Sequence, residues 1–597
     1  MSQQDITIKR TGAEKVRWDL SDLYSNVDEL RQDLAHVERE AEAFAQKYRG
    51  TLKQATAAVW REALEAFEAL HERLGRAYTY AYLYWSTDTT DPQRGALLQE
   101  VRERYTAITQ QMLFFELEWV LLPDEQAEAL LSRQELAAYR HYLELQRRYR
   151  PHVLSEPEEK IMAEKAVTGR SAWNRLFDET LGAARFPFRE EELSEQEILA
   201  KLHDPDRDVR RDAALGFTEG LEKHLRTLTF VFNTVLADKA TDDRIRKYRH
   251  WLESRNMANE ITDEAVQALV DAVTSRYDLV ARFYTLKRRL LGYDVLYDYD
   301  RYAPIGEAAT TYTWEEARDL VLEAYESFHP EMARIASLFF ERKWIDAALS
   351  TGKREGAFSH GAVPSVHPYI LMSYTGKIRD VQTLAHELGH GIHQYLSREQ
   401  GYLQADTPLT TAETASVFGE MLVFQKLMAQ EKEPRNRLSM LVGKIDDTIA
   451  TVFRQIAMNR FEDRIHTARR TMGELPVERF NEFWMETQEH MFQGSVKLGS
   501  HYRIWWSYIP HFIHTPGYVY AYAFGELLVL ALYQKYREEG ASFVERYLEL
   551  LRAGGSDWPH RLIARLGVDL DHPAFWHQGL AAIEEWIEQA EALADQV

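Results

Sequence analysis

The sequence predicts a predominantly α-helical protein with one small β element. Apolar residues recur at helical spacing over most of the chain, as Leu30, Leu34 and Val37 do within residues 27–49. A convincing strand pattern occurs only within residues 356–376. No internal repeat, low-complexity tract or long linker interrupts the helical patterns. We therefore expect an all-α fold class, with the β element in a local role.

The composition is that of an ordinary globular protein of 597 residues, of which 28% are charged and 45% hydrophobic. The absence of cysteine excludes disulfides, thiolate metal sites and a cysteine nucleophile, and it fits a reducing compartment. The formal net charge of −22 disfavours nucleic acid and anionic membranes as partners. The N-terminus shows no secretory signal, and no apolar run of about 18 residues occurs. We expect a cytoplasmic protein with no nucleic acid and no membrane as a partner.

Helical patterns fill the N-terminal part of the chain, over residues 27–49, 53–85, 92–120 and 124–148. Pro151 interrupts them, because proline cannot continue a helix. Ser155 and Glu158 then form a capping box that opens the next helix. A further short helix is predicted at residues 194–202.

The regular pattern is weakest between residues 187 and 207, which predicts a domain boundary there. We divide the chain into an N-terminal domain, residues 1–195, and a C-terminal domain, residues 196–597. In the second domain, helical patterns cover residues 207–290 and 314–348 and return after the β element.

The β element contains Pro364 and Pro368, which confine it to edge positions of a sheet. Tyr369 to Tyr374 is predicted to be an exposed edge strand. Such a strand can bind an extended peptide by adding it as a further strand. Tyr369 and Tyr374 are therefore candidate substrate-binding residues, and a small structural hairpin is the alternative.

The segment after the strand carries His386-Glu387-x-x-His390. Residues i and i+4 lie on one face of a helix, so both imidazoles can bind one cation. Glu387 is turned about 100° from His386 and can act as a general base beside a metal ion. The flanking residues are apolar, and burying these polar groups together is costly unless a metal satisfies them. Asp380 is the predicted N-cap of this helix.

A catalytic zinc site commonly has three protein ligands, and Glu413 is the predicted third. It follows His390 by 23 residues, enough for the chain to turn back and present a carboxylate. The small residues around both segments, including Gly389 and Ala415, permit a close approach. Thr410 and Glu413 also form a capping-box pattern, so Glu413 closing its own helix is the alternative.

Two further polar residues are candidates for positions around the metal ligands. Glu420 lies two turns beyond Glu413 and is predicted to hold an imidazole N–H. His393 lies where the three-histidine HExxHxxGxxH pattern requires glycine, and that pattern also lacks its third histidine. His393 is therefore expected to support the site or the structure rather than to bind the metal.

Residues 503–525 are dense in histidine and tyrosine. Tyr518 and Tyr522 are one helical turn apart, and neutral donors of this kind suit the oxyanion of peptide hydrolysis. An aromatic core helix is the alternative.

These features occur together with several longer motifs, which are Trp18–Tyr24 (WDLSDLY), Pro368–Tyr374 (PYILMSY), His386–His393 (HELGHGIH), Ala412–Ser416 (AETAS), Pro510–Phe512 (PHF) and Tyr518–Tyr522 (YVYAY). In this order, the motifs closely resemble those of the oligoendopeptidase F group in the M3 (thimet-oligopeptidase-like) family of zinc metallopeptidases. The resemblance spans almost the whole chain.

The resemblance implies a two-lobed, all-helical ellipsoid with a deep central substrate channel and one Zn²⁺ at its floor. It implies that residues 1–195 form the N-terminal oligopeptidase F domain and residues 196–597 the catalytic domain. It also implies endopeptidase action on short unstructured oligopeptides, because such a channel excludes folded proteins.

Carried over by motif, His386, His390 and Glu413 are zinc ligands and Glu387 is the catalytic base. His511, Tyr518 and Tyr522 resemble the donors to substrate and transition state, and His514 competes with His511 for this role. The sequence departs from the family at Ser359, where cysteine is common, and at Gly517, where an aromatic residue is common. These departures leave the side-chain preference for substrate open.

Two other functions are compatible with the sequence. A metallocarboxypeptidase of similar helical fold would use the same zinc ligands. A non-catalytic peptide-binding protein stabilised by zinc would not need the base Glu387. The oligomeric state, monomer or homodimer, is not fixed by the sequence.

Overall fold

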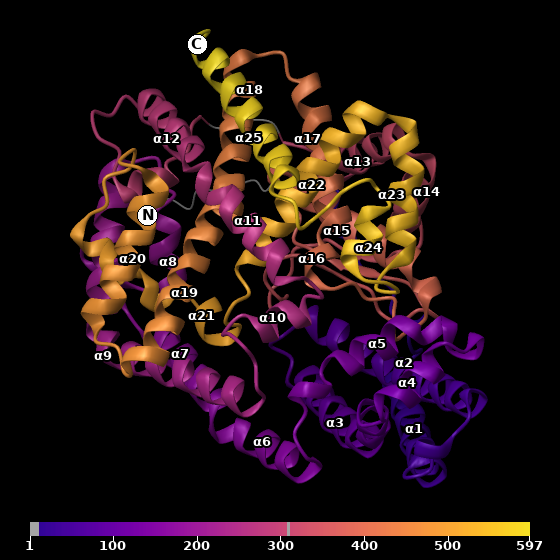
Figure 1. Ribbon diagram of the computed structural model, residues 1–597. Helices are drawn as coiled ribbons and strands as arrows, with labels where there is room; N and C mark the ends of the chain where they lie inside the picture. Colours follow the sequence, from indigo (N-terminus) through magenta and orange to yellow (C-terminus); the bar gives the residue numbers. More distant parts are fainter. Residues whose placement is uncertain (1–10, 307–310) are drawn as a thin grey trace. The chain divides into compact units, whose positions relative to one another are not determined.

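The computed structural model describes residues 11–306 and 311–597 and confirms the predicted all-α class (Figure 1). The chain divides into two compact units, each built from three separate stretches. Unit 1 comprises Met1–Arg150, Ala309–Leu427 and Glu538–Gly567, and unit 2 comprises Pro151–Ala308, Met428–Arg537 and Val568–Val597, each within the described ranges. The predicted boundary between residues 195 and 196 divides the chain into two domains that are consecutive in sequence, and it stays a prediction.

The helices and strands of unit 1 are α1 (Val27–Tyr48), α2 (Ala57–Ser86), α3 (Pro92–Val120), α4 (Asp124–Leu131), α5 (Arg140–Arg148), α13 (Trp314–Phe328), α14 (Pro330–Glu341), β3 (Ile345–Asp346), β4 (Phe358–His360), β5 (Tyr369–Leu371), α15 (Ile378–Ser397), α16 (Leu409–Ala412), α17 (Thr414–Gln430), α23 (Ala541–Ala553) and α24 (Pro559–Ala564).

The helices and strands of unit 2 are α6 (Glu156–Thr168), α7 (Arg170–Ala183), β1 (Phe186–Phe188), β2 (Glu191–Leu193), α8 (Glu195–Lys201), α9 (Arg207–Ile245), α10 (Glu253–Ala258), α11 (Asp263–Ser275), α12 (Tyr277–Leu291), α18 (Pro434–Ile449), α19 (Gln455–Met472), α20 (Val477–Phe492), α21 (His511–His514), α22 (Tyr520–Glu539) and α25 (Pro573–Ala594). Helices α17 and α22 each run across a boundary between the units.

The predicted start of the helix after Pro151 is confirmed. Ser155 and Glu158 form the capping box of α6, and Thr313 caps α13 with its side chain. Asp380 is not the N-cap of α15, as was predicted. That position belongs to Lys377, and Asp380 lies three residues further on, where its carboxylate accepts the Lys377 backbone N–H at 3.1 Å.

The β element of unit 1 is a three-stranded sheet in the order β3-β5-β4. Strand β5 pairs in parallel with β3 and antiparallel with β4. The predicted edge strand from Tyr369 to Tyr374 is therefore wrong: β5 is the central strand, and β4 is an edge among the described strands. The rings of Tyr369 and Tyr374 are fully buried, and the Tyr374 hydroxyl donates to the Tyr312 carbonyl oxygen at 2.9 Å.

Helices α15 and α17 approach each other through glycines. A Cβ at Gly389 would collide with the Ala415 carbonyl oxygen and lie 2.6 Å from Ser416 Cα. A Cβ at Gly419 of α17 would in turn lie 3.1 Å from the Ala385 carbonyl oxygen of α15. The predicted close approach of the two segments is confirmed. It brings the backbone of α17 next to the histidine-bearing stretch of α15.

Unit 2 is organised around the long helix α9. The segment η7 (Ser500–Tyr508) packs against α9, and the Trp505 indole N–H donates to Thr218 Oγ1 at 2.9 Å. The indole N–H of Trp506 donates to Asn481 Oδ1 at 2.8 Å. These buried anchors hold the segment that leads into α21 and α22.

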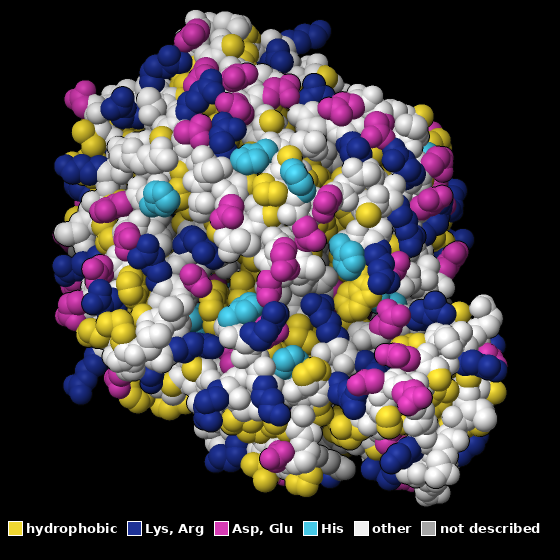
Figure 2. All heavy atoms as spheres, viewed as in Figure 1, with side chains coloured by type: hydrophobic (Ala, Val, Ile, Leu, Met, Phe, Trp, Pro, Cys, Tyr) yellow, Lys and Arg dark blue, Asp and Glu magenta, His cyan; other side chains and the backbone are white. Residues whose placement is uncertain are grey.

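Among the described residues, no helix is long and apolar enough to cross a membrane. On the face drawn in Figure 2, acidic and basic side chains are interspersed with neutral ones. No single patch of acidic side chains stands out on this face.

The substitution G389A is expected to lower the free energy of unfolding by about 3 kcal/mol, because the added methyl group meets the backbone of α17, which cannot move aside as a side chain can. G95A in α3 is the matched control, since a Cβ there meets no atom within 4 Å. It should leave the stability unchanged or raise it by about 0.5–1 kcal/mol. Thermal unfolding followed by circular dichroism measures both. Equal melting temperatures for the two variants would contradict the close approach.

Candidate metal centre and active site

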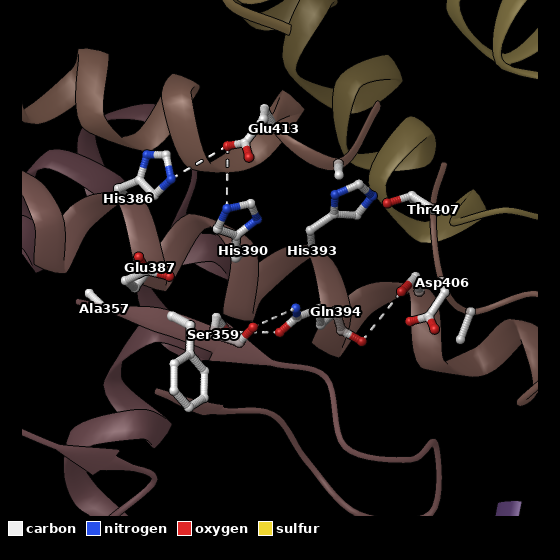
Figure 3. Close-up of a pocket in the computed structure, with 14 residues that line it drawn as sticks. Ala357, Ser359, His386, Glu387, His390, His393, Gln394, Asp406, Thr407 and Glu413 are labelled. Atoms are coloured by element: carbon white, nitrogen blue, oxygen red, sulfur yellow. Dashed lines mark hydrogen bonds and ion pairs between the residues drawn. The ribbon is translucent and has the colours of Figure 1, made fainter. Parts of the chain in front are cut away.

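Two histidines of α15 lie on the same side of the helix. His386 and His390 are one turn apart, with ring centroids separated by 4.9 Å. Glu413, between α16 and α17, points its carboxylate at both rings: its Oε2 lies 3.4 Å from His386 Nε2 and 3.3 Å from His390 Nε2. Figure 3 shows the three side chains converging from two elements. One possible ligand atom from each lies within 4.8 Å of the other two.

Glu413 was predicted either to bind a metal or to cap its own helix. Helix α16 has Pro408 as its N-cap and ends at Glu413, so Thr410 begins no helix that Glu413 could close. The Glu413 carboxylate instead faces the imidazoles and accepts a hydrogen bond from Ser416 Oγ at 2.6 Å. This position fits the metal-binding alternative.

Glu420 lies on the other side of His386. Its Oε2 is 3.4 Å from His386 Nδ1, while Glu413 faces the Nε2 of the same ring. A carboxylate at the second nitrogen fixes the tautomer and the orientation of an imidazole that binds a metal through the first. The predicted role of Glu420 in holding an imidazole N–H is therefore compatible with the geometry.

The electrostatics of this cluster follow from burial and opposite charge. Burial by itself lowers the pKa of His386, but the hydrogen bond to Glu420 and the charge of Glu413 outweigh it and raise the pKa to about 9. For Glu413, burial by itself raises the pKa, but the hydrogen bond to His390 and its charge outweigh burial and lower the pKa to about 2. In the metal-free protein at neutral pH, a proton on His386 therefore supplies the positive charge that the carboxylates require.

A divalent cation fits this donor set. Two imidazole nitrogens and one carboxylate oxygen are the ligands of many catalytic zinc sites, which leave a further position open. The cation would replace the proton on His386 and compensate the charge of Glu413. The residues present therefore match the group that the sequence pattern predicts.

Glu387 is buried beside the cluster. Burial raises the pKa of its carboxyl group, and the charges of His386 and His390 oppose that change. The backbone N–H of Ser359, in strand β4, acts in the direction that lowers this pKa. Strand β4 thus lies beside the predicted base.

A recess of about 480 Å³ runs along α15 and contains the cluster (Figure 3). The residues that line it are Ala357, Phe358, Ser359, His386, Glu387, His390, His393, Gln394, Ser397, Ala405, Asp406, Thr407, Ala412 and Glu413. Neither Tyr369 nor Tyr374 is among them, so the structure gives no support to a substrate contact by these rings.

Two hydrogen bonds between Ser359 and Gln394 connect strand β4 to α15. Ser359 Oγ donates to Gln394 Oε1 at 2.8 Å, and Gln394 Nε2 donates to the Ser359 carbonyl oxygen at 3.4 Å. This contact holds β4 against the helix that carries Glu387. Sequence reasoning passed over Gln394, although its position four residues after His390 places it on the same helical face.

His393 lies in the recess but apart from the three converging residues. Its ring is buried, and burial lowers its pKa to about 3, with the charge of His390 acting in the same direction. The imidazole is therefore neutral near pH 7. This agrees with the expectation that His393 supports the site without binding the metal.

The predicted donors of residues 503–525 form a cluster within unit 2. His511 Nε2 lies 3.0 Å from the Tyr522 hydroxyl, and the Tyr518 and Tyr522 rings pack edge to face at 5.0 Å. His511 and Tyr518 have nearly parallel rings, with centroids 6.2 Å apart. His514 takes no part in this cluster: its Nε2 lies 2.8 Å from Asp178 Oδ1 on α7.

The loop that carries Tyr518 depends on Gly517 and a buried carboxyl group. Gly517 has a φ of +78°, and a Cβ there would lie 2.6 Å from Leu252 Cδ1. Its N–H donates to Glu462 Oε1 at 2.8 Å, and burial raises the pKa of Glu462 to about 8. Glycine at this position, which departs from the family pattern, is therefore required by the conformation of the loop.

Comparison with known proteins identifies two family models in this chain. The model described as "Peptidase family M3" matches residues 200–582, and the model described as "Oligopeptidase F" matches residues 118–186. The first match covers more than half of the chain and includes every residue of the cluster on α15 and α17.

Characterised relatives match over nearly the whole chain. Oligopeptidase PepF of Bacillus subtilis is 28% identical, with 96% of this chain and 87% of the relative covered. The group B oligopeptidase PepB of Streptococcus agalactiae is also 28% identical, with 97% of each chain covered.

Solved structures share the fold. Oligoendopeptidase-F of Enterococcus faecium superimposes with a TM-score of 0.73 at 25% identity, covering 96% of this chain and 99% of that one. A protein of Chlamydophila abortus described as a peptidase gives a TM-score of 0.86 at 25% identity, covering 98% of this chain and 100% of that one.

Binding of Zn²⁺ to the metal-free protein is expected to release about one proton near pH 7.5, because His386 is protonated there and must lose its proton to bind the metal. The raised pKa of His386 determines the direction in which stability changes with pH. The proton on His386 stabilises the folded metal-free protein fully below its ordinary value of 6.5, and this contribution is lost as the pH rises through about 9. Proton release should therefore fall to zero above that pH. Calorimetry in two buffers of different protonation enthalpy measures it.

The variant E420Q should release fewer protons near pH 7.5, since it removes the hydrogen bond that raises the pKa of His386. Glu399 is exposed just after α15, so E399Q is the matched control and should behave like the wild type. Proton release that does not change between pH 7 and 10 would rule out the raised pKa.

Proposed function

Because the chain belongs to peptidase family M3, we propose that it is a zinc-dependent endopeptidase that hydrolyses internal bonds of short, unstructured oligopeptides. The predicted family and the predicted peptidase class are confirmed. One observation carries the proposal for this chain: His386, His390 and Glu413 converge in a recess that also contains the buried carboxyl group of Glu387.

In this proposal, His386, His390 and Glu413 hold one Zn²⁺ per chain, and Glu420 orients the ring of His386. Peptidases of this family are zinc metallopeptidases. When bound, zinc supplies a Lewis acid that makes water more acidic and polarises the peptide carbonyl group. These ligands come from the two predicted helical segments, and none of them is cysteine, which the sequence lacks.

Glu387 is the proposed general base. It takes a proton from water while the water oxygen forms a bond to the carbonyl carbon of the peptide. It then gives this proton to the leaving nitrogen as the carbon–nitrogen bond breaks, so that one water is consumed and the carboxylate is restored. The raised pKa of Glu387 favours holding the proton between the two steps.

His511, Tyr518 and Tyr522 are the proposed donors to the oxyanion and the substrate. Their mutual contacts within unit 2 support a common role, and they favour His511 over His514, which is paired with Asp178. Burial lowers the pKa of His511, so its ring is neutral at pH 7. Neutral donors that are fixed in advance stabilise an oxyanion without reorganisation during the reaction.

The endopeptidase proposal is favoured over the two alternatives by the residues of unit 1. None of the residues that line the recess is Lys or Arg, the side chains with which a carboxypeptidase holds a free C-terminal carboxylate. A protein that only binds peptides has no need for a buried base that is oriented beside a metal centre. A cytoplasmic location, which the composition favours, and substrate selection by a central channel are parts of the same proposal, and the oligomeric state stays open.

The variant E387Q should bind zinc as the wild type does and lose at least about 10³-fold in kcat, because glutamine cannot take up the proton. The substrate is a peptide blocked at both ends, which an endopeptidase cleaves and a carboxypeptidase does not. Mass spectrometry gives the products, and elemental analysis gives the zinc content. E399Q is the control. Near-normal turnover by E387Q, or no cleavage of blocked peptides by the zinc-loaded wild type, would contradict the proposal.

The variant Y518F should lower kcat by about 10²-fold and leave KM within about twofold, because the lost hydroxyl acts on the oxyanion and not on the bound substrate. Y522F should show a smaller loss, since its hydroxyl also contacts His511. Y536F on the same helix is the matched control. Steady-state kinetics on the blocked peptide distinguish these cases. A change in KM alone would show that the Tyr518 hydroxyl does not stabilise the oxyanion.

A further inference from the structure

Asp406 lies in the recess at the end opposite His386. It belongs to the loop between α15 and α16, and Figure 3 shows it beyond Gln394, with the metal-ligand candidates at the other end. Its side chain is exposed to the recess and takes no part in the metal cluster. The reaction proposed above gives it no role.

The surroundings of Asp406 leave its charge without a cation. Among the described residues that line the recess, none is Lys or Arg, and Asp406, Glu387 and Glu413 are all acidic. Burial by the surrounding walls raises the pKa of Asp406, and no neighbouring positive charge acts to lower it. A cationic group of a bound substrate would compensate this charge.

The loop that carries Asp406 is fixed from two sides within unit 1. The buried Gln404 donates to the Ala138 carbonyl oxygen at 2.7 Å and accepts the Tyr142 backbone N–H at 3.2 Å. From the other side, Gly555 donates its N–H to the Gln404 carbonyl oxygen at 2.9 Å. A Cβ at Gly555 would collide with the Asp406 carbonyl oxygen, so this approach requires glycine. Asp406 is therefore presented in a fixed position, which lowers the entropic cost of binding a partner.

The stretch of α15 that lines the recess gives the scale of the separation between Asp406 and the reaction centre. The recess follows α15 from His390 to Ser397, seven residues of helix or about 10 Å at 1.5 Å per residue. An extended peptide advances about 3.3 Å per residue. A peptide lying along the recess therefore brings a residue about three positions from the cleaved bond to Asp406.

We propose that Asp406 is a specificity-determining residue that binds a cationic group of the peptide substrate about three residues from the cleaved bond. The group is the guanidinium or ammonium of an Arg or Lys side chain, or the N-terminal ammonium of a peptide that ends at this position. Either group would donate a charged N–H hydrogen bond to the Asp406 carboxylate. The inference rests on the proposed peptidase function of the same site and names its substrate class.

The test uses the zinc-loaded full-length protein and peptides blocked at both ends. One position, two to four residues from the cleaved bond on either side, carries Arg, citrulline or Glu. Citrulline keeps the shape of Arg and removes its charge. Wild type should cleave one Arg peptide with a kcat/KM about tenfold above its citrulline partner and further above its Glu partner. In D406N this ratio should fall to within about twofold, and D406K should favour Glu over Arg.

D28N is the matched control, because Asp28 is an exposed carboxylate of unit 1 outside the recess and its loss changes the net charge equally. It should keep the wild-type ratio. A further pair of peptides has a free or an acetylated N-terminus at the responsive position and separates the two sources of the cation. If the wild type prefers the free amine and D406N does not, the cation that Asp406 binds is the N-terminal ammonium.

Two results overturn the inference while the peptidase proposal stands: a wild-type ratio near one at every position, or a ratio that D406N leaves unchanged. If zinc-loaded wild type cleaves none of the peptides, the proposed function fails and the inference fails with it. Circular dichroism and zinc content establish that D406N and D406K are folded and loaded, so that a changed ratio reports on the recess.

Discussion

The crossing of α15 and α17 is the constraint on which the site depends. Gly389 lets the α17 backbone reach α15, and Gly419 leaves room for the Tyr325 hydroxyl, which donates to the Ala385 carbonyl oxygen of α15 at 2.6 Å. Only at this separation can Glu413 and Glu420 reach opposite nitrogens of the same imidazole. A wider spacing would leave these partly exposed carboxylates beyond the reach of the imidazole nitrogens.

The same crossing favours the binding of a cation. Two carboxylates and two imidazoles share a space with restricted access to water, and the metal-free protein satisfies them by keeping a proton on His386 well above its ordinary pKa. A divalent cation supplies more charge at the same place and leaves the imidazoles neutral. The stability of the helix pair and the affinity for metal therefore have a common origin, and changes in helix spacing affect both.

The local part of this site was predictable from the sequence, and the non-local part was not. The four-residue spacing of His386 and His390 fixes their relative position on a helix, and small residues indicated the close approach of α17. The order of strands depends on partners far away in sequence, so the pattern from Tyr369 to Tyr374 did not show that β5 is central. Asp406 lies in a loop whose position is set by Gln404 and Gly555, and no periodic pattern indicates such contacts.

Three carboxyl groups of one recess differ in their environments, and these differences separate their tasks. Imidazoles lower the pKa of Glu413, which keeps it ionised as a ligand. Burial dominates at Glu387 and raises its pKa, which suits a group that must take up and return a proton. Burial also raises the pKa of Asp406, which lies at the far end of the recess from His386. In the proposed function, residues of the same charge would hold a metal, take up a proton and bind a substrate cation, because their pairing and solvation differ within one recess.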